Sequence, residues 1–207
     1  MPVIKNIIFD LGGVIMNIDF KKTEKAFADL GFNDFAQHMT QYHITPLFQE
    51  YETGKINDDD FVKGIQQIAA KPIADNEIIH AWNALLLDFP PERIALLEKL
   101  RHRYRIFLLS NTNALHYNAF QQRLHGLTGK TLEDIFEKTY YSHTANLRKP
   151  DAAIYQLVLD ENQLDPAETL FIDDTASNLG GAEEAGIQTL HLKAPMTILD
   201  IPLFHNK

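Results

Sequence analysis

Three short polar clusters each follow an apolar run of the kind found in buried strands. They are Asp10, Ser110-Asn111-Thr112 and Asp173-Asp174. Carboxylate, hydroxyl and amide oxygens are hard ligands of the kind that Mg²⁺ prefers, and with the cation of Lys149 they also suit a phosphate group. These residue types predict a site that binds phosphate and a divalent cation.

Each of these residues also has an ordinary structural explanation. An aspartate at a strand end, such as Asp10, often stabilises a turn, and Ser110-Asn111-Thr112 before a helix is typical of an N-cap. A lysine before proline, as at Lys149, is usually exposed. The adjacent carboxylates of Asp173-Asp174 are harder to explain in this way, because they repel each other and a cation would relieve the repulsion. The order and placement of the clusters favour one shared site.

The elements that must position these clusters are short strands separated by helices. Four apolar runs without sustained polar alternation are typical of parallel strands buried on both faces, namely residues 3–9, 104–109, 169–172 and 187–192. Helical patterns separate the last three, and one helix is expected to open after Lys149-Pro150, with Ile154 and Val158 on one face. This alternation predicts an α/β parallel sheet with crossover helices. Because ligands bind outside the carboxyl ends of such strands, the clusters are expected to converge there.

Residues 17–88 show one helical pattern after another and no strand pattern. Apolar residues recur at helical spacing around Trp82, and Gly31 is typical of a helix end. We therefore expect an all-helical domain inserted into a core that is formed by residues 1–16 and 89–207. The alternative is that these helices belong to one mixed domain, which their periodicity does not exclude.

The composition is that of a folded protein with an acidic balance. Of 207 residues, 45% are hydrophobic, which is enough for a substantial core, and the formal net charge is −9. A negative charge disfavours nucleic acid and anionic membranes as partners. The chain has no cysteine and no apolar run long enough to span a bilayer, and its histidines lack metal-ligand spacing. These features predict a soluble, cytoplasmic protein without disulfides or a zinc site, compatible with a monomer or a homodimer.

Four segments of the chain resemble the motifs of the haloacid dehalogenase superfamily of phosphatases. They are IIFDLGGVI, FLLSNTN, LRKPDAAIY and LFIDDTASNLGGAEEAG, and they follow the order and intervals of that superfamily. The segment YETGKINDDDF also resembles the cap of its glucose-1-phosphatase-like branch. The resemblance implies a Rossmann-like core with residues 17–88 as a helical cap of the C1 type.

The resemblance also implies a function. It is that of a magnesium-dependent phosphatase that acts on a small phosphorylated metabolite, with glucose 1-phosphate favoured. Asp10 would attack phosphorus and form a transient aspartyl-phosphate, which splits a difficult hydrolysis into two easier steps. Ser110 and Asn111 would hold the phosphoryl group, and Lys149 would neutralise negative charge on the phosphate and on Asp10.

The same resemblance implies a set of ligands for the cofactor, Mg²⁺. Asp10 and the backbone carbonyl of Gly12 would contribute from the first motif. Asp173 and Asp174 would contribute from the last, with Asp174 the better candidate for direct ligation and Asp173 supporting or sharing the ligand shell. Asn178 is expected to support these ligands from behind.

Gly12 is the main departure from the pattern of the superfamily. Most of its phosphatases place a second aspartate there, which protonates the leaving oxygen and later activates water. Glycine cannot transfer a proton, and general acid–base catalysis typically contributes about 10²–10⁴-fold. An anomeric hydroxyl is more acidic than an ordinary alcohol, so our first hypothesis is that a sugar 1-phosphate needs less protonation. A donor from the cap, such as His43, or a metal-bound water is the alternative.

Two functions other than phosphatase remain open at this point. A 2-haloacid dehalogenase would use Asp10 against carbon without a metal, and Gly12 is compatible with that chemistry. The pair Asp173-Asp174 argues against it, because metal-free relatives generally replace those acids. The second is a non-catalytic module that binds a phosphometabolite, which retention of Asp10 and Lys149 disfavours. In a phosphatase, the cap is expected to close over the substrate, with hinges around residues 12–20.

Overall fold

A parallel five-stranded sheet forms the centre of the core. The computed structural model describes residues 3–32, 46–69 and 71–205. The strands lie in the order β3-β2-β1-β4-β5, with bounds β1 (Asn6–Phe9), β2 (Arg105–Ser110), β3 (Lys138–Tyr141), β4 (Thr169–Asp173) and β5 (Gln188–His191). Phe9 at the end of β1 pairs with Leu108 of β2 and with Ile172 of β4. The carboxyl ends of these three strands therefore lie level at one edge of the sheet.

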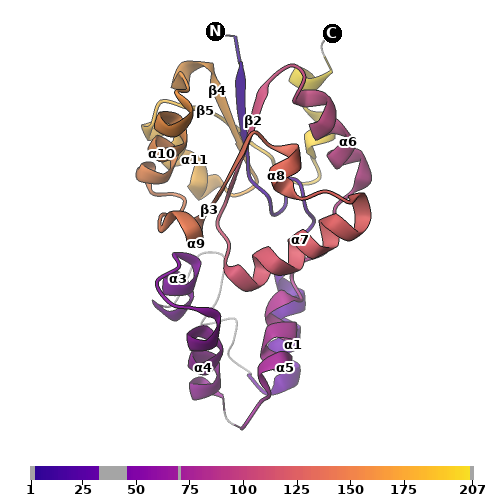
Figure 1. The fold of residues 1–207 in the computed structure, drawn as a ribbon, viewed down its shortest axis with the longest axis vertical. Coiled ribbons are helices and arrows are strands. Elements are labelled where there is room, and N and C mark those ends of the chain that lie inside the picture. Colours follow the sequence, from indigo (N-terminus) through magenta and orange to yellow (C-terminus); the bar gives the residue numbers. More distant parts are fainter. Residues whose placement is uncertain (1–2, 33–45, 70, 206–207) are drawn as a thin grey trace.

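Helices cover both faces of the sheet (Figure 1). Their bounds are α6 (Pro91–Leu100), α7 (Ala114–Thr128), α8 (Leu132–Ile135), α9 (Ser142–Ala145), α10 (Ala152–Asn162) and α11 (Ala176–Glu184). Short 3₁₀ turns follow at η1 (Pro166–Glu168), η2 (Ile198–Asp200) and η3 (Pro202–Phe204). Ile7 packs in the cluster that contains α6 and α7, and its neighbour Ile8 packs in the cluster that contains α10 and α11. The strands are thus buried on both faces, as their composition predicts.

The α/β fold predicted from the sequence is confirmed, with two corrections. Strand β3 was not expected, because Lys138-Thr139-Tyr140-Tyr141 lacks a continuous apolar run; as an edge strand it pairs with β2 alone. Helix α10 begins at Ala152 with Asp151 as its N-cap, so Pro150 does not occupy the first turn. Lys149 accordingly lies in the loop before the helix.

The helices of the inserted region have a hydrophobic core of their own at one end of the molecule (Figure 1). They are α1 (Phe20–Leu30), α3 (Pro46–Glu52), α4 (Asp58–Ile68) and α5 (Asp75–Asn83). Trp82 is fully buried there and packs against Phe48 and Phe61. Helix α1 ends at Gly31, whose φ of 103° few other residues adopt. We call α1, α3, α4 and α5 the helical region; the boundaries at 17 and 88 remain a prediction.

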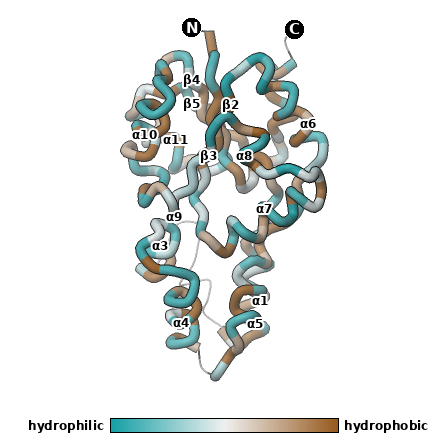
Figure 2. The backbone as a smooth tube through the Cα atoms, viewed as in Figure 1, coloured by the Kyte–Doolittle hydropathy of each residue, from teal (hydrophilic) through white to brown (hydrophobic). Residues whose placement is uncertain are grey.

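Sequence polarity explains why these helices pack as they do. Figure 2 shows both hydrophobic and hydrophilic residues on α1, α4 and α5, which is the mixture expected of amphipathic helices. In α4 the buried side chains are Phe61, Val62 and Ile65, and the first turn carries the exposed acids Asp59 and Asp60. Along the described ranges, no helix combines the length and apolar character needed to cross a membrane.

The helical region joins the core through two crossing segments and a buried polar network. Ile18 and Leu86 pair in an antiparallel bridge, which ties the outgoing chain to the returning one. On the core side, Asn113 accepts a hydrogen bond from Trp82 Nε1 at 3.2 Å. His116 stacks on the Trp82 ring with 4.8 Å between ring centroids. These contacts fix the helical region over the carboxyl edge of the sheet.

Candidate active site

Lys149 joins two buried carboxylates at the carboxyl edge of the sheet. Its Nζ lies 2.6 Å from Oδ1 of Asp10 and 2.7 Å from Oδ2 of Asp173. Asp10 follows β1 and Asp173 ends β4, so the parallel register of these strands brings the two acids together. All three side chains are buried. An ion cluster of this kind, withdrawn from water, is costly to the fold and is therefore a candidate for function.

Burial and charge set the ionisation of this cluster. Burial raises the pKa of Asp10 to about 7; Lys149 opposes this effect, and the neighbouring carboxylates add to it. Burial would lower the pKa of Lys149, but the carboxylates of Asp10 and Asp173 outweigh it and hold that pKa above its ordinary value. The ammonium is therefore charged. One further cation near Asp10 would favour its ionised form, because an opposite charge stabilises a carboxylate.

Asp174 completes an acidic cluster that fits a hard divalent cation. Oxygens of Asp10, Asp173 and Asp174 all lie within 4.8 Å of one another. Three carboxylates without nitrogen or sulfur donors are a ligand set suited to Mg²⁺. Beside them, Gly13 has a φ of 75°, and a Cβ at this position would overlap Oδ2 of Asp174. The second glycine after β1 therefore leaves the space that the Asp174 carboxylate occupies.

The two adjacent acids have different surroundings. Asp173 accepts hydrogen bonds from the Thr175 amide at 2.7 Å and from Asn178 Nδ2 at 3.0 Å, in addition to its ion pair with Lys149. Both of its oxygens thus have protein donors. Asp174 is only partly buried and accepts a hydrogen bond from Thr175 Oγ1 at 3.1 Å. Asp174 is the more open of the pair.

Ser110 and Asn111 lie where β2 ends, beside this cluster. Ser110 is buried with 4% of its surface exposed. Asn111 holds the backbone of Lys149: its Nδ2 donates to the Lys149 carbonyl at 2.9 Å, and its Oδ1 accepts from the Lys149 amide at 2.9 Å. The next residue, Thr112, is held by Ser142, whose hydroxyl accepts from the Thr112 amide and donates to its carbonyl, both at 2.9 Å. These bonds fix the loop after β2 and the lysine together.

The position that lacks a proton donor lies beside an apolar side chain. A Cβ at Gly12 would lie 3.0 Å from Cδ1 of Ile18. Gly12 also pairs with Met16 in an isolated bridge, so the chain returns on itself directly after the strand. A side chain at this position would require the end of the Ile18 side chain to shift by a few tenths of an ångström.

A cavity of about 100 Å³ lies between the site and the helical region. Its wall is mostly apolar, and its polar members are Ser110, Asn111, Thr112, His116 and Glu52. Glu52 is the last residue of α3 and reaches the cavity from the helical region. Its Oε2 lies 3.0 Å from a terminal guanidinium nitrogen of Arg148, the neighbour of Lys149.

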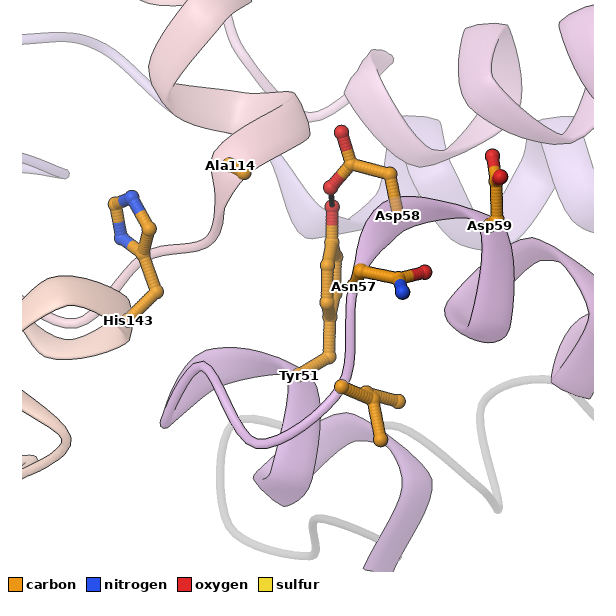
Figure 3. A pocket seen from close by; sticks show the side chains of 7 residues that line it. Tyr51, Asn57, Asp58, Asp59, Ala114 and His143 are labelled. Carbon is orange, nitrogen blue, oxygen red and sulfur yellow. Dashed lines mark hydrogen bonds between the residues drawn. The ribbon is translucent and has the colours of Figure 1, made fainter.

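A second and more open cavity of about 380 Å³ lies further out on the same boundary. Figure 3 shows Tyr51 and Asp58 of the helical region on one wall and His143 of the core on the other. The Tyr51 hydroxyl donates to Asp58 at 2.6 Å and accepts from the Leu115 amide at 3.1 Å. Tyr51 thus ties α3 to the start of α7.

The structure places most of the residues singled out from the sequence at one edge of the sheet. The residues that lie together there are Asp10, Asn111, Lys149, Asp173, Asp174 and Asn178. Ser110 and Gly12 line the adjoining cavity. His43, the expected donor from the cap, lies outside the described residues. The roles of all these residues remain predictions.

Three residues in or near the site were missed by sequence reasoning. Gly13 could have been noticed, since it is one of two consecutive glycines after a strand. The reason that only glycine fits there is the close approach of Asp174, which the sequence does not show. Thr175 could have been found as the residue after the acidic pair. Glu52 lies within a segment that resembles a family cap, yet no pattern in the sequence indicates that it faces the core.

Comparison with known proteins identifies the family and several relatives of this chain. A family model described as haloacid dehalogenase-like hydrolase matches residues 4–186. D-ribitol-5-phosphate phosphatase of Bacteroides thetaiotaomicron is 34% identical over 187 residues, which cover 90% of this chain and 91% of that protein. A sesquiterpene phosphatase of Aspergillus oryzae is 24% identical over 190 residues, which cover 91% of this chain and 89% of that protein.

The fold also has a close match among solved structures. A crystal structure of a haloacid dehalogenase family enzyme from Bacteroides thetaiotaomicron superimposes with a TM-score of 0.91 and 35% sequence identity. The match covers 99% of this chain and 100% of that one. That structure is of an aspartate-to-alanine mutant in complex with magnesium and inorganic phosphate.

Proposed function

Because the chain belongs to the haloacid dehalogenase-like hydrolases, we propose that it is a magnesium-dependent phosphatase that forms a covalent phosphoryl intermediate at Asp10. One observation carries this proposal: Lys149 contacts Asp10 and Asp173 at 2.6 and 2.7 Å, within a carboxylate cluster beside the buried Ser110. Such a site combines a nucleophile, a fixed cation and a place for a divalent metal.

In this proposal the oxygen of Asp10 that does not face Lys149 attacks phosphorus. In the described part of the chain, Oδ1 accepts from Lys149 and no hydrogen bond reaches Oδ2. Lys149 offsets the negative charge that gathers when a phosphate dianion approaches a carboxylate. Ser110 contributes a hydroxyl for a non-bridging phosphate oxygen. Asn111 acts through Lys149, whose backbone it holds on both sides.

Asp10, Asp174 and the carbonyl of Gly12 would hold Mg²⁺, with Asp173 as a supporting neighbour. The more open carboxylate of Asp174 supports this division. When bound, the ion supplies positive charge that lowers the repulsion between the phosphate and the acidic cluster. Asp173 is held by Lys149, Thr175 and Asn178, which suits a residue that orients its neighbours.

We further propose that the substrate is a small phosphate monoester of a sugar or polyol. The cavity beside Ser110 is only about 100 Å³, which limits the group that fits without movement of the helical region. The relative named D-ribitol-5-phosphate phosphatase supports a polyol ester. Glucose 1-phosphate, which the sequence favoured, is the alternative substrate. The helical region would serve as the cap and would close over either one.

Two other functions fit the site less well. A metal-free dehalogenase has no use for the cluster of Asp173 and Asp174, whose mutual repulsion is a cost to the fold without a cation. A module that only binds phosphometabolites has no use for a buried lysine paired with the carboxylate of Asp10. We therefore retain the phosphatase.

Release of inorganic phosphate tests this proposal. The purified protein is assayed with ribitol 5-phosphate and glucose 1-phosphate, with Mg²⁺ and after treatment with a chelator. We expect turnover that depends on Mg²⁺ and is lost in Asp10→Asn. Chloride release from 2-chloropropionate in the presence of the chelator, without phosphatase activity, would establish the dehalogenase instead.

A further inference from the structure

The proposed reaction needs a proton at the leaving oxygen, and the residue after Leu11 cannot give one. A sugar or polyol hydroxyl other than the anomeric one departs poorly as an alkoxide, so a positioned acid is valuable. Gly12 has no side chain, and a Cβ there would lie 3.0 Å from the end of the Ile18 side chain. A titratable side chain on another element that borders the same space could serve as the donor instead.

Within the described residues, two titratable side chains line the cavity beside Ser110 and Gly12, namely Glu52 and His116. Both ring nitrogens of His116 are committed, with Nε2 3.1 Å from the Trp82 carbonyl and Nδ1 3.0 Å from Asn113 Nδ2. Burial lowers its pKa to about 4, so the ring is neutral at pH 7. His116 has no proton to give without breaking this network.

Glu52 differs from His116, because burial raises its pKa and favours a form that has a proton to give. Its Oε2 is buried and forms an ion pair with Arg148, whose terminal guanidinium nitrogen lies 3.0 Å away. Its place is fixed by the turn that follows it. The Thr53 carbonyl accepts from Asn146 at 2.8 Å, and Gly54 packs so closely on the His143 carbonyl that a Cβ would overlap it. The carboxyl group is thus held against the core beside the site.

We propose that Glu52 is the general acid and base of this phosphatase, supplied by the helical region in place of the residue missing at position 12. This inference rests on the proposed function. As Asp10 attacks phosphorus, the bond from phosphorus to the alcohol oxygen breaks, and that oxygen takes the proton of Glu52. A water molecule then attacks phosphorus and gives its proton to Glu52. The bond from phosphorus to Asp10 breaks and inorganic phosphate is released. Asp10 is then a carboxylate again and Glu52 is again protonated.

The surroundings of Glu52 suit a group that alternates between two charge states. Burial raises its pKa and favours the protonated donor, while Arg148 and, more weakly, Lys149 oppose that shift. The same arginine stabilises the carboxylate that remains after donation. Because Glu52 belongs to α3, the acid reaches the site only when the helical region is docked, which couples proton transfer to closure.

The test compares two esters that differ in their need for protonation. Ribitol 5-phosphate releases an alcohol, whereas p-nitrophenyl phosphate releases a stable phenolate. For Glu52→Gln we expect kcat/KM to fall about 10²–10⁴-fold with the first ester and less than about tenfold with the second. This parameter ends at the first irreversible step, the loss of the alcohol, so it isolates the acid role. Loss of the base role should slow the hydrolysis of phosphoryl-Asp10. The first turnover should then release nitrophenol in a burst that is faster than the following turnovers.

Two further variants serve as controls. Glu50→Gln changes an exposed residue on the same helix and should leave both esters unaffected. Glu52→Asp keeps a carboxylic acid and should recover part of the activity toward ribitol 5-phosphate. Equal losses with both esters in Glu52→Gln, or no recovery in Glu52→Asp, would overturn the inference while the phosphatase stands. If the wild-type protein with Mg²⁺ released phosphate from neither ester, the proposed function itself would fail.

Discussion

Asn111 holds Lys149 by both of its backbone polar groups, with each hydrogen bond 2.9 Å long. The lysine lies in a loop, so neither a helix nor a strand fixes its backbone. A side-chain amide is well suited to this task because it carries a donor and an acceptor a short distance apart. The ammonium of Lys149 therefore owes its place between two carboxylates to a residue on the neighbouring strand end.

Replacement of this amide should impair turnover more than substrate binding. In Asn111→Ala we expect kcat to fall roughly 10–100-fold, because a small displacement of a catalytic group is costly, with a smaller change in KM. Steady-state kinetics measure both. Asn76→Ala, at an exposed position of α5, is the matched control and should behave as wild type. A rise in KM with kcat unchanged would mean that Asn111 only binds substrate.

Gly13→Ala should weaken both the fold and metal binding. The Cβ of the new alanine would overlap Asp174, and the alanine backbone would have to adopt a φ of 75°. Gly129→Ala is a matched control, because its φ of 71° is similar but no atom lies within 4 Å of its Cβ. We expect a loss of about 1 kcal/mol for the control and a larger loss for Gly13→Ala. Urea unfolding measures the stabilities, and equal losses would exclude a role for the contact with Asp174.

Mg²⁺ should raise the melting temperature of the protein through the acidic cluster. A ligand that binds only the folded state, at a concentration of about 100 times its dissociation constant, adds about 2.7 kcal/mol to the free energy of unfolding. We expect Mg²⁺ to raise the melting temperature of the wild-type protein accordingly, and to raise that of Asp174→Asn much less. Asp29→Asn removes an acid from an exposed pair with Lys25 and should keep the full shift. An undiminished shift in Asp174→Asn would place the ion elsewhere.

The buried histidine under the helical region should make the fold sensitive to acid. Burial lowers the pKa of His116 to about 4, against about 6.5 in an unfolded chain. Between these values the unfolded chain binds a proton that the folded protein does not, so the free energy of unfolding decreases as the pH falls. The loss from this group is up to about 3 kcal/mol and is absent above about pH 6.5.

His116→Gln isolates this contribution, since the amide can still donate to the Trp82 carbonyl but cannot titrate. We expect the free energy of unfolding of the variant to vary less steeply with pH between about 6.5 and 4, by up to about 1.4 kcal/mol per pH unit. Urea unfolding at a series of pH values measures the slope. Parallel curves for the two proteins would show that His116 is not the titrating group.

Much of the site could be predicted because parallel strands align their ends. Asp10, Ser110 and Asp173 each lie at or directly after the end of a strand, and the register of β1, β2 and β4 brings them to one edge. The role of Lys149 could be predicted only from the family resemblance, because a lysine in a loop belongs to no periodic pattern that would place it. Its expected helix begins three residues later than Lys149, at Ala152.

Other parts of the molecule depend on contacts that no local pattern encodes. The need for glycine at position 13 comes from Asp174, which is distant in the sequence. Glu52 reaches the core through the docking of α3, and amphipathic spacing shows which face of a helix is buried but not against what. Strand β3 is stabilised by its pairing with β2, although its own residues are polar and aromatic.

The covalent step at Asp10 is the centre of this account, and a rapid-quench experiment tests it most directly. The protein is mixed with Mg²⁺ and substrate, stopped in acid within one turnover, digested and analysed by mass spectrometry. We predict a phosphoryl group on the peptide that contains Asp10, which appears before inorganic phosphate and is absent in Asp10→Asn. Release of phosphate at the full rate with that peptide unmodified at every time, or with the phosphoryl group on another residue, would contradict it.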